Sequence, residues 1–329
     1  MADALAAIAL LGLVCYGLTG GADYGGGVWD LLARGPRAEA HRRLISDAIG
    51  PIWEANHVWL ILVIVILFTA FPTGFAAIAT ALHIPLTLML VGIVLRGSAF
   101  TFRSYDLGHG GLGHRFGPPF AIASLLTPIL LGVNLGALGS GGIVVEGGRV
   151  VSGFIKPWLR PFPFAVGILA LCLFAYLAAV YLAVEAAQRP AEPALSEDFR
   201  RRGLLAAAVA AAVAALVFGL AKVAAPVLYA HLLRLWPLHG LTLGLSGLAA
   251  VALWRRRYRL ARLGAAGQVA AILIGWGLSQ YPYLVLPSIE LHAAAAPPET
   301  LRLLLLVLVL GGPILLPSFV YLFRVFKAR

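Results

Sequence analysis

The feature that most constrains this chain is a succession of long apolar runs joined by short polar connections. A bilayer core about 30 Å thick requires roughly 20 consecutive apolar residues in a helix that crosses it. Such runs recur throughout the 329 residues, and we expect nine membrane-spanning helices, near residues 4–20, 57–76, 78–99, 118–138, 162–184, 203–224, 237–254, 266–286 and 301–324. The predicted fold class is therefore an all-α polytopic membrane protein.

Composition excludes a soluble globular domain of this size. Hydrophobic residues make up 61% of the chain and charged residues 12%, whereas a soluble domain has about 25% charged residues. The net charge of +11 does not indicate nucleic-acid binding, because the arginines occupy separate short loops rather than one continuous patch. Basic loops of this kind set membrane topology and contact anionic lipid.

The unequal distribution of basic residues between alternate loops predicts the orientation. Most arginines fall on one side of the expected spans, and the other side holds only Arg149, Lys156, Arg160, Lys222, Arg234 and Arg302. Because basic loops stay in the cytoplasm, we expect the N-terminus outside and the C-terminus in the cytoplasm. No basic segment precedes the first apolar run, so we expect it to remain as a span. We treat residues 1–329 as a single integral membrane domain, with two four-helix bundles and one peripheral helix.

A glycine-rich segment, Gly20-Gly21-Ala22-Asp23-Tyr24-Gly25-Gly26-Gly27, follows the first apolar run. One interpretation is a glycine-rich cap and loop that ends the helix. The other is that the glycines let a neighbouring helix or a cofactor approach closely, with Asp23 at the membrane edge. A nucleotide-binding glycine loop is disfavoured, because no strand precedes the segment.

Residues 53–59 carry an acid and an imidazole at the entrance to the second span. Glu54 and His57 are three residues apart, so they share one face of a helix. The two side chains could relay protons, bind metal, or satisfy each other and the helix N-terminus. Ligation of haem iron by His57 is a further alternative. Trp53 and Trp59 are typical of the aromatic belt at a membrane interface.

Arg96 is a charged residue deep in an otherwise apolar run. Such residues are costly in lipid, and they usually face the protein interior and pair with another group. Glu54 is the expected partner, because a turn at Phe71-Pro72-Thr73-Gly74 would make the second and third spans antiparallel neighbours. The alternative is that Arg96 extends along its helix to the membrane surface.

Four motifs occur in order between residues 19 and 103. They are Thr19-Gly20-Gly21-Ala22-Asp23-Tyr24-Gly25, Trp53-Glu54-Ala55-Asn56-His57-Val58-Trp59-Leu60, Leu67-Phe68-Thr69-Ala70-Phe71-Pro72 and Leu95-Arg96-Gly97-Ser98-Ala99-Phe100-Thr101-Phe102-Arg103. Together they resemble subunit II of the cytochrome bd-type quinol oxidases, including the cyanide-insensitive branch. That family has Thr-Asp-Gly-Phe-Asp-Leu-Gly, Trp-Asp-Gly-Asn-Glu-x-Trp-Leu, Leu-Phe-x-x-Phe-Pro and Phe-Arg-Gly-x-Ala-Phe-Glu-Phe-Arg. Trp53, Asn56 and Pro72 stand at motif positions with structural roles.

The resemblance implies a subunit of a heterodimeric oxidase in the bacterial inner membrane. In that family, subunit I holds haems b and d, or b alone, and the quinol site, and the complex oxidises quinol and reduces dioxygen to water. Subunit II binds no haem, and no catalytic residue is expected in this chain. It can hold a structural quinone, contact lipid and associate with small single-span accessory subunits.

The resemblance also implies roles for individual residues. Glu54 stands where the family has a proton-path aspartate, and Arg96 is its neighbour. Asp23 and His57 are further candidates for the proton pathway, and Trp59 would lie near the oxygen entry. No metal site is expected in this chain.

Three departures from the family pattern leave other functions open. Gly20 and Thr101 replace acidic residues, and His57 replaces Glu or Gln. One alternative is a proton-coupled secondary transporter that uses Glu54, His57 and Arg96. The other is a divergent structural or haem-bearing subunit of another respiratory complex.

Overall fold

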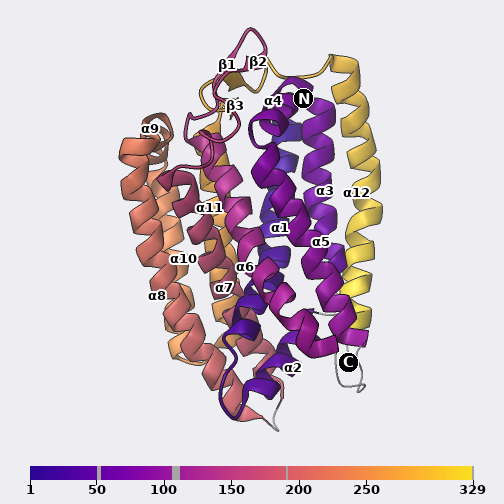
Figure 1. The fold of residues 1–329 in the computed structure, drawn as a ribbon, viewed down its shortest axis with the longest axis vertical. Helices are drawn as coiled ribbons and strands as arrows, with labels where there is room; N and C mark the ends of the chain where they lie inside the picture. Colours follow the sequence, from indigo (N-terminus) through magenta and orange to yellow (C-terminus); the bar gives the residue numbers. More distant parts are fainter. Residues whose placement is uncertain (50–52, 106–111, 190–191, 328–329) are drawn as a thin grey trace.

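The computed structural model describes residues 1–49, 53–105, 112–189 and 192–327, and most of these residues lie in helices (Figure 1). The helices are α1 (Ala2–Leu31), α2 (Ala38–Ile49), α3 (Trp53–Ala70), α4 (Pro72–Ala81), α5 (His83–Tyr105), α6 (Leu112–Gly139), α7 (Pro161–Ala187), α8 (Pro193–Ala224), α9 (Pro226–Arg234), α10 (Trp236–Trp254), α11 (Tyr258–Gln280) and α12 (Pro298–Lys327). Two short antiparallel pairs complete the fold: β1 (Val145–Glu146) with β2 (Arg149–Val150), and β3 (Tyr283–Val285) with β4 (Ile289–Glu290).

The prediction of nine spans is confirmed for the described part of the chain. Nine helices are long and apolar enough to cross a membrane, namely α1, α3, α5, α6, α7, α8, α10, α11 and α12. Figure 1 shows them side by side, with β1 and β2 at one end and α2 at the other. The all-α polytopic fold class is therefore correct.

Several predicted span boundaries are wrong; α8, for example, begins at Pro193 rather than near residue 203. The second and third spans were expected to meet in one tight turn, but α3 ends at Ala70 and the short helix α4 separates it from α5. Pro72 is the first residue of α4, where its missing N–H costs nothing. The eighth span was expected at residues 266–286, yet α11 covers Tyr258–Gln280. Its arginines lie inside the first turns of the helix rather than in the preceding loop.

The glycine-rich segment after the first apolar run is helical, so its interpretation as a cap and loop is wrong. Helix α1 continues to Leu31, and a Cβ on Gly25 would overlap the carbonyl oxygen of Phe174 on α7. A Cβ on Gly21 would lie 2.6 Å from the ring of the same phenylalanine. These glycines therefore allow the close approach of α7 to α1, as the second interpretation predicted.

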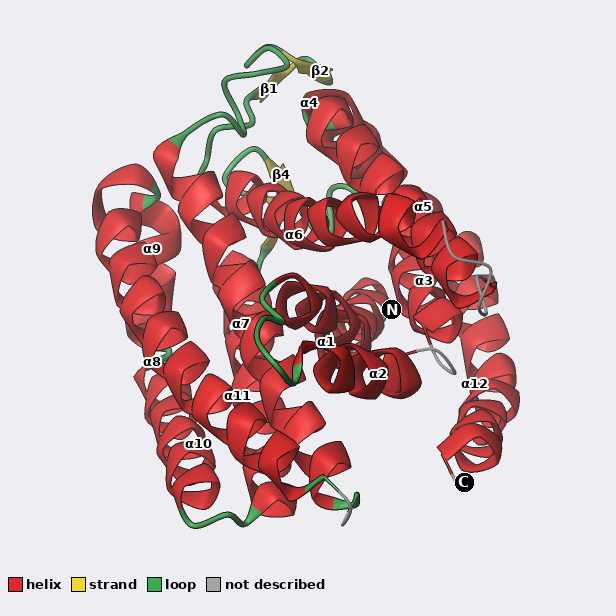
Figure 2. Cartoon of the chain, turned by 60° about the horizontal axis from the view of Figure 1, so that its bottom comes forward, coloured by secondary structure: helices red, strands yellow, loops and turns green. Residues whose placement is uncertain are grey.

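Helix α7 lies at the centre of the packing. It packs against α8, α6 and α1, while α5 packs against α6 and α10 against α11. Helix α3 packs mainly against α1, and α12 lies at the edge of the molecule beside α3 (Figure 2). The edge position of α12 agrees with the expected peripheral helix, and the division of the other spans into two four-helix bundles stays a prediction.

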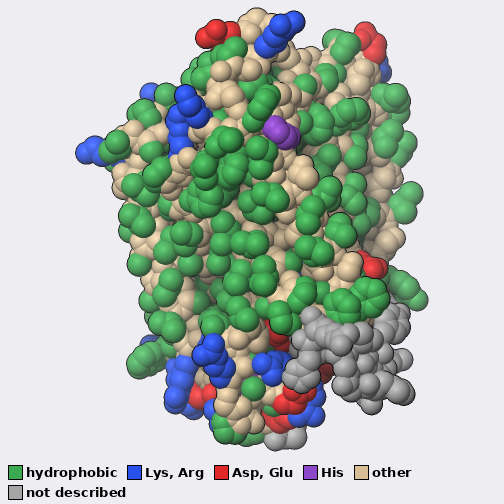
Figure 3. Space-filling model, in the orientation of Figure 1, with side chains coloured by type: hydrophobic (Ala, Val, Ile, Leu, Met, Phe, Trp, Pro, Cys, Tyr) green, Lys and Arg blue, Asp and Glu red, His purple; other side chains and the backbone are tan. Residues whose placement is uncertain are grey.

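The surface is divided between an apolar middle and charged ends (Figure 3). We call one of these ends the arginine-rich end; it comprises α2, the start of α8 and the turn between α10 and α11. Ion pairs join these elements, because Arg37 contacts Asp198 at 2.8 Å and Arg256 contacts Glu197 at 3.4 Å. The positive charge predicted for alternate loops is thus gathered at one end of the bundle.

Gly25→Ala should destabilise the fold by about 1–3 kcal/mol, because a side chain there cannot enter without separating α1 from α7. Gly244→Ala on α10 is the matched control, since nothing lies within 4 Å of a Cβ at that position. Thermal unfolding of the purified protein in detergent measures both. Equal melting temperatures for the two variants would contradict the packing argument.

Candidate functional site

Arg96 is buried in the interior of the helices, with a relative exposure of 1%. Its Nη2 donates a hydrogen bond to the backbone carbonyl oxygen of Asp23 at 3.0 Å. The guanidinium carbon lies 4.7 Å from the ring centroid of Tyr24 and 5.3 Å from that of Phe120. Arg96 therefore does not extend to the membrane surface, and α1 and α6 enclose its charge.

Asp23 links this arginine to the third helix. Asn56 on α3 donates a hydrogen bond from Nδ2 to Asp23 Oδ2 at 2.7 Å, and both side chains are buried. Because α1 carries Asp23 and α5 carries Arg96, three helices meet at this point. We call Arg96, Asp23, Tyr24, Asn56, Tyr16 and His57 the Arg96 cluster.

Two aromatic side chains extend the cluster toward His57. The hydroxyls of Tyr16 and Tyr24 lie 3.3 Å apart, and the ring of Tyr16 lies 5.9 Å from the imidazole of His57. Trp53 meets the same imidazole edge to face at 6.4 Å. The chain of contacts therefore runs without interruption from His57 to Arg96. Tyr16 was not among the site residues predicted from the sequence.

Several polar atoms of the cluster are buried without a hydrogen-bond partner among the described residues. They are His57 Nδ1, Asn56 Oδ1 and Arg96 Nε, and Thr127 Oγ1 on α6 shares this property. Buried polar atoms are almost always satisfied by protein or by ordered water. The cluster is therefore a site where water molecules would find partners.

The predicted ion pair between Glu54 and Arg96 is wrong. Glu54 is exposed, and the ion pairs among the described residues include none between these two side chains. The prediction assumed that α3 and α5 are direct neighbours. Helix α3 packs mainly on α1 and α5 on α6, and α3 touches α5 where Trp53 lies against Gly97 and Phe100. Arg96 consequently reaches α1 and not the start of α3.

The remaining motif residues have packing contacts. A Cβ on Gly97 would lie 2.7 Å from the ring of Trp53. This close contact explains the glycine after Arg96. Trp59 stacks on Phe319 of α12 at a centroid distance of 5.1 Å. Pro72 starts α4, as described above. These contacts attach α3 to its neighbours on both sides.

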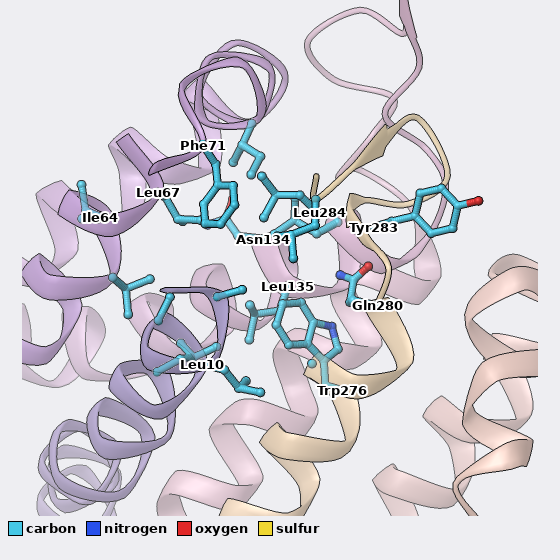
Figure 4. A pocket seen from close by; sticks show the side chains of 18 of the residues that line it. Leu10, Ile64, Leu67, Phe71, Asn134, Leu135, Trp276, Gln280, Tyr283 and Leu284 are labelled. Carbon is cyan, nitrogen blue, oxygen red and sulfur yellow. The ribbon is translucent and has the colours of Figure 1, made fainter. Parts of the chain in front are cut away.

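An apolar cavity of about 400 Å³ lies between α1, α3, α6 and α11 (Figure 4). Gln280 is 5% exposed, and neither its Oε1 nor its Nε2 has a hydrogen-bond partner in the described structure. The indole N–H of Trp276 and Oδ1 of Asn134 are likewise buried and unpaired. The cavity thus combines an apolar wall with polar groups that lack partners, which is the usual composition of a small-molecule site.

This cavity was not predicted from the sequence. Asn134 and Gln280 are uncharged polar residues within or at the end of apolar runs, and that pattern could have drawn attention to them. Which groups face a common space depends on the packing of four helices, and the sequence does not contain that information directly. No group of three or more His, Cys, Asp or Glu side chains that could hold a metal ion occurs among the described residues.

A second group of polar contacts lies at the arginine-rich end. Arg37 donates two hydrogen bonds to the carboxylate of Asp198, at 2.8 and 2.9 Å. His41 is 3% exposed, and its Nε2 lies 3.0 Å from Asp198 Oδ2. Arg202 Nη2 lies 3.5 Å from His41 Nδ1. These contacts join α2 to α8.

The fold and the buried arginine define a polytopic helical membrane protein with a polar cluster between its first, third and fifth helices. The chain belongs to the family described as cytochrome bd terminal oxidase subunit II, whose profile matches residues 1–326. With nine candidate spans among the residues that the structure describes, it is a multi-pass protein of the bacterial inner membrane. Family membership disfavours the transporter alternative.

Individual relatives agree with this assignment. A segment of 113 residues is 33% identical to cytochrome bd ubiquinol oxidase subunit 2 of Bacillus subtilis strain 168, and it covers 30% of this chain and 32% of that protein. A segment of 126 residues is 29% identical to cytochrome bd-I ubiquinol oxidase subunit 2 of Escherichia coli strain K12, covering 38% and 32%. The matched segments thus span about a third of these two relatives.

Two further comparisons extend over the whole chain. The putative cytochrome bd menaquinol oxidase subunit II of Bacillus subtilis is 21% identical over 336 aligned residues, covering 98% of this chain and 95% of that protein. The structure of the bd oxidase from Geobacillus thermodenitrificans matches with a TM-score of 0.76 at 22% identity, covering 98% of both chains. The structural match shows a shared fold.

Acidification should destabilise the arginine-rich end through His41. Burial, and then the nearby Arg202, lowers the pKa of His41 below its ordinary value, which is about 6.5. Because the pKa of His41 is lower in the folded state than in the unfolded state, its contribution to the stability of the fold is fully present above a pH of about 6.5. This contribution is lost as the pH falls through the folded-state pKa. Thermal unfolding between neutral and mildly acidic pH measures the effect.

The His41→Gln variant should lose this part of the pH dependence, because glutamine does not titrate there. His83→Gln is the control, since His83 is an exposed residue at the start of α5. If the thermal unfolding of wild type and of His41→Gln shows the same pH dependence, His41 does not contribute to the loss of stability at acidic pH.

Proposed function

We propose that this chain is the non-haem subunit of a bd-type oxidase that oxidises quinol and reduces dioxygen to water. The observation that carries the proposal is the family match over residues 1–326. Two quinols would supply the four electrons that convert one dioxygen to two waters, with four protons taken up from the cytoplasm. The haem-bearing subunit I would perform this chemistry, and this chain is not catalytic alone.

The Arg96 cluster is the proposed proton pathway of this chain. General acid–base transfer requires groups within hydrogen-bond reach, directly or through one water. Asn56 and Asp23 are already hydrogen-bonded, and the unpaired atoms of His57, Asn56 and Arg96 are positions where water could complete the chain. Arg96 would keep the path from carrying other cations, because its positive charge is fixed.

Glu54 is the proposed entry group. It is exposed at the start of α3, which follows α2 at the arginine-rich end. Under the positive-inside rule this end faces the cytoplasm, so the N-terminus lies outside and the C-terminus inside. Glu54 would then collect protons from the cytoplasmic side without being paired to Arg96.

Two further roles belong to the same proposal. Trp59, stacked on Phe319 near the edge of the bundle, would lie on the oxygen route.

The apolar cavity fits a structural quinone, because Gln280 and Trp276 offer unpaired donors and an acceptor for carbonyl and hydroxyl oxygens. Bound there, a quinone would supply redox or structural chemistry that the chain itself lacks. Small single-span accessory subunits stay a prediction from the resemblance.

The test is purification of the chain in mild detergent with whatever accompanies it, followed by an absorption spectrum and an oxygen-consumption assay with quinol. We expect a haem-rich partner with b-type and d-type bands, or b-type bands alone, and quinol oxidase activity. A colourless chain purified alone would contradict the proposal. Haem retained on this chain by itself would revive the haem-bearing alternative through His57.

Glu54→Gln should lower the rate of oxygen reduction about 10²-fold or more, as loss of a proton-transfer group typically does, while the spectrum stays unchanged. The substitution removes a titratable group but almost no volume. Glu39→Gln is the matched control, because Glu39 is also exposed at the arginine-rich end, on α2. A Glu54→Gln complex that turns over at the wild-type rate would exclude Glu54 from the pathway.

A further inference from the structure

A second cavity, of about 420 Å³, lies at the arginine-rich end between the end of α7 and the start of α11. Its lining includes the basic side chains of Arg256, Arg257 and Arg259. Val184, Ala187 and Leu260 contribute apolar atoms to the same lining. The cavity is separate from both the Arg96 cluster and the apolar cavity at the opposite end, and the proposed oxidase activity does not use it.

The sharp turn between α10 and α11 brings the arginines together. Helix α10 ends at Trp254, Arg256 adopts a left-handed backbone conformation with φ of 58°, and Arg257 N donates to Ala252 O at 2.8 Å. Helix α11 begins at Tyr258, so the first backbone N–H groups of this helix lie at the same place as the arginines. Arginine guanidinium groups are well suited to phosphate, because their fork of donors matches its oxygens.

The three lining arginines outnumber the carboxylates near this cavity, which include Glu197 and, on α7, Glu185; Glu185 is not among the lining residues. The sequence contains no Asp or Glu between Asp198 and Glu290. Arg256 is 3.4 Å from Glu197, but that carboxylate also binds Arg200 and Arg201. Within the described structure, Arg257 and Arg259 form no ion pair with a carboxylate. The cavity therefore favours an anionic occupant.

The surroundings of the cavity place it at the membrane surface. It lies where two candidate spans end, α10 at Trp254 and α11 at Tyr258. Trp254 is 74% exposed, as expected for an aromatic residue at the lipid interface. Leu263 lies one turn after Arg259 on α11 and is 68% exposed. The apolar surface of α11 therefore continues from the arginines toward the middle of the membrane. An occupant with both an anionic group and alkyl chains would match both surfaces.

We propose that this cavity binds the phosphate headgroup of an anionic phospholipid, with its acyl chains lying along the exposed apolar side chains of α11. Arg257 and Arg259 hold the phosphate, and Leu260 contacts the glycerol and the first methylene groups. Basic pockets between membrane helices commonly select anionic lipids in this way. A lipid bound there would link the end of α7 to the start of α11 at the arginine-rich end.

The experiment uses the purified complex in nanodiscs with a phosphatidylglycerol that carries a photoactivatable diazirine in its headgroup. Crosslinked peptides are then mapped by mass spectrometry. We expect crosslinks at residues 184–188 and 254–260, and few with a matched phosphatidylcholine probe. Replacing both arginines, in Arg257→Gln with Arg259→Gln, should lower the crosslink yield about tenfold or more, since each basic residue contributes separately to the attraction.

The control is Arg34→Gln with Arg43→Gln, which removes the same charge from exposed positions at the same end. It should leave the yield unchanged. Arg257→Lys with Arg259→Lys keeps the charge and should give an intermediate crosslink yield. This variant tests the proposal even where the glutamine variant fails to fold. Three results would each overturn the proposal: a glutamine variant with the wild-type yield, equal labelling by phosphatidylcholine, or displacement of the lipid by excess inorganic phosphate.

Discussion

Arg96 places a permanent positive charge among helices whose other side chains are mostly apolar. An isolated charge in such a setting is costly, so the packing around it must supply compensating contacts. The carbonyl oxygen of Asp23 accepts its hydrogen bond, and the rings of Tyr24 and Phe120 face the guanidinium. Because desolvated cation–π contacts contribute about 2 kcal/mol, these partners fix α5 against α1 and α6.

The same stretch of α1 supplies both the polar partners of Arg96 and the glycines that allow close packing. Gly21 and Gly25 face Phe174 on α7, and a Cβ on Gly27 would overlap Ser124 on α6. Asp23 and Tyr24 lie between these glycines and face the arginine. The tight contacts exclude lipid from the cluster, so its unpaired polar atoms depend on water or on one another. Packing and the proposed proton pathway therefore have a common origin in residues 20–27.

The sequence is sufficient for the fold class, since the length and spacing of apolar runs determine how many helices can cross a membrane. Boundaries were less predictable: the arginines at the start of α11 belong to the helix because its charged end reaches the membrane surface. The predicted partner of Arg96 was wrong because the Arg96 side chain faces α1 and α6, whereas Glu54 is exposed at the start of α3. Trp276 and Gln280 are four residues apart on α11 and share one face of it, but only the packing of the helices brings Asn134 of α6 to the same cavity.

The most direct test of this account is the thermal stability of the purified complex carrying Arg96→Leu. We expect the free energy of unfolding to fall by roughly 1–3 kcal/mol, the usual cost of leaving a buried polar group without its partner, and less partner subunit to be recovered. Arg201→Leu is the comparison, because the side chain of Arg201 is 75% exposed, and it should be close to neutral. An Arg96→Leu complex as stable and as fully assembled as wild type would contradict the central role of the buried guanidinium.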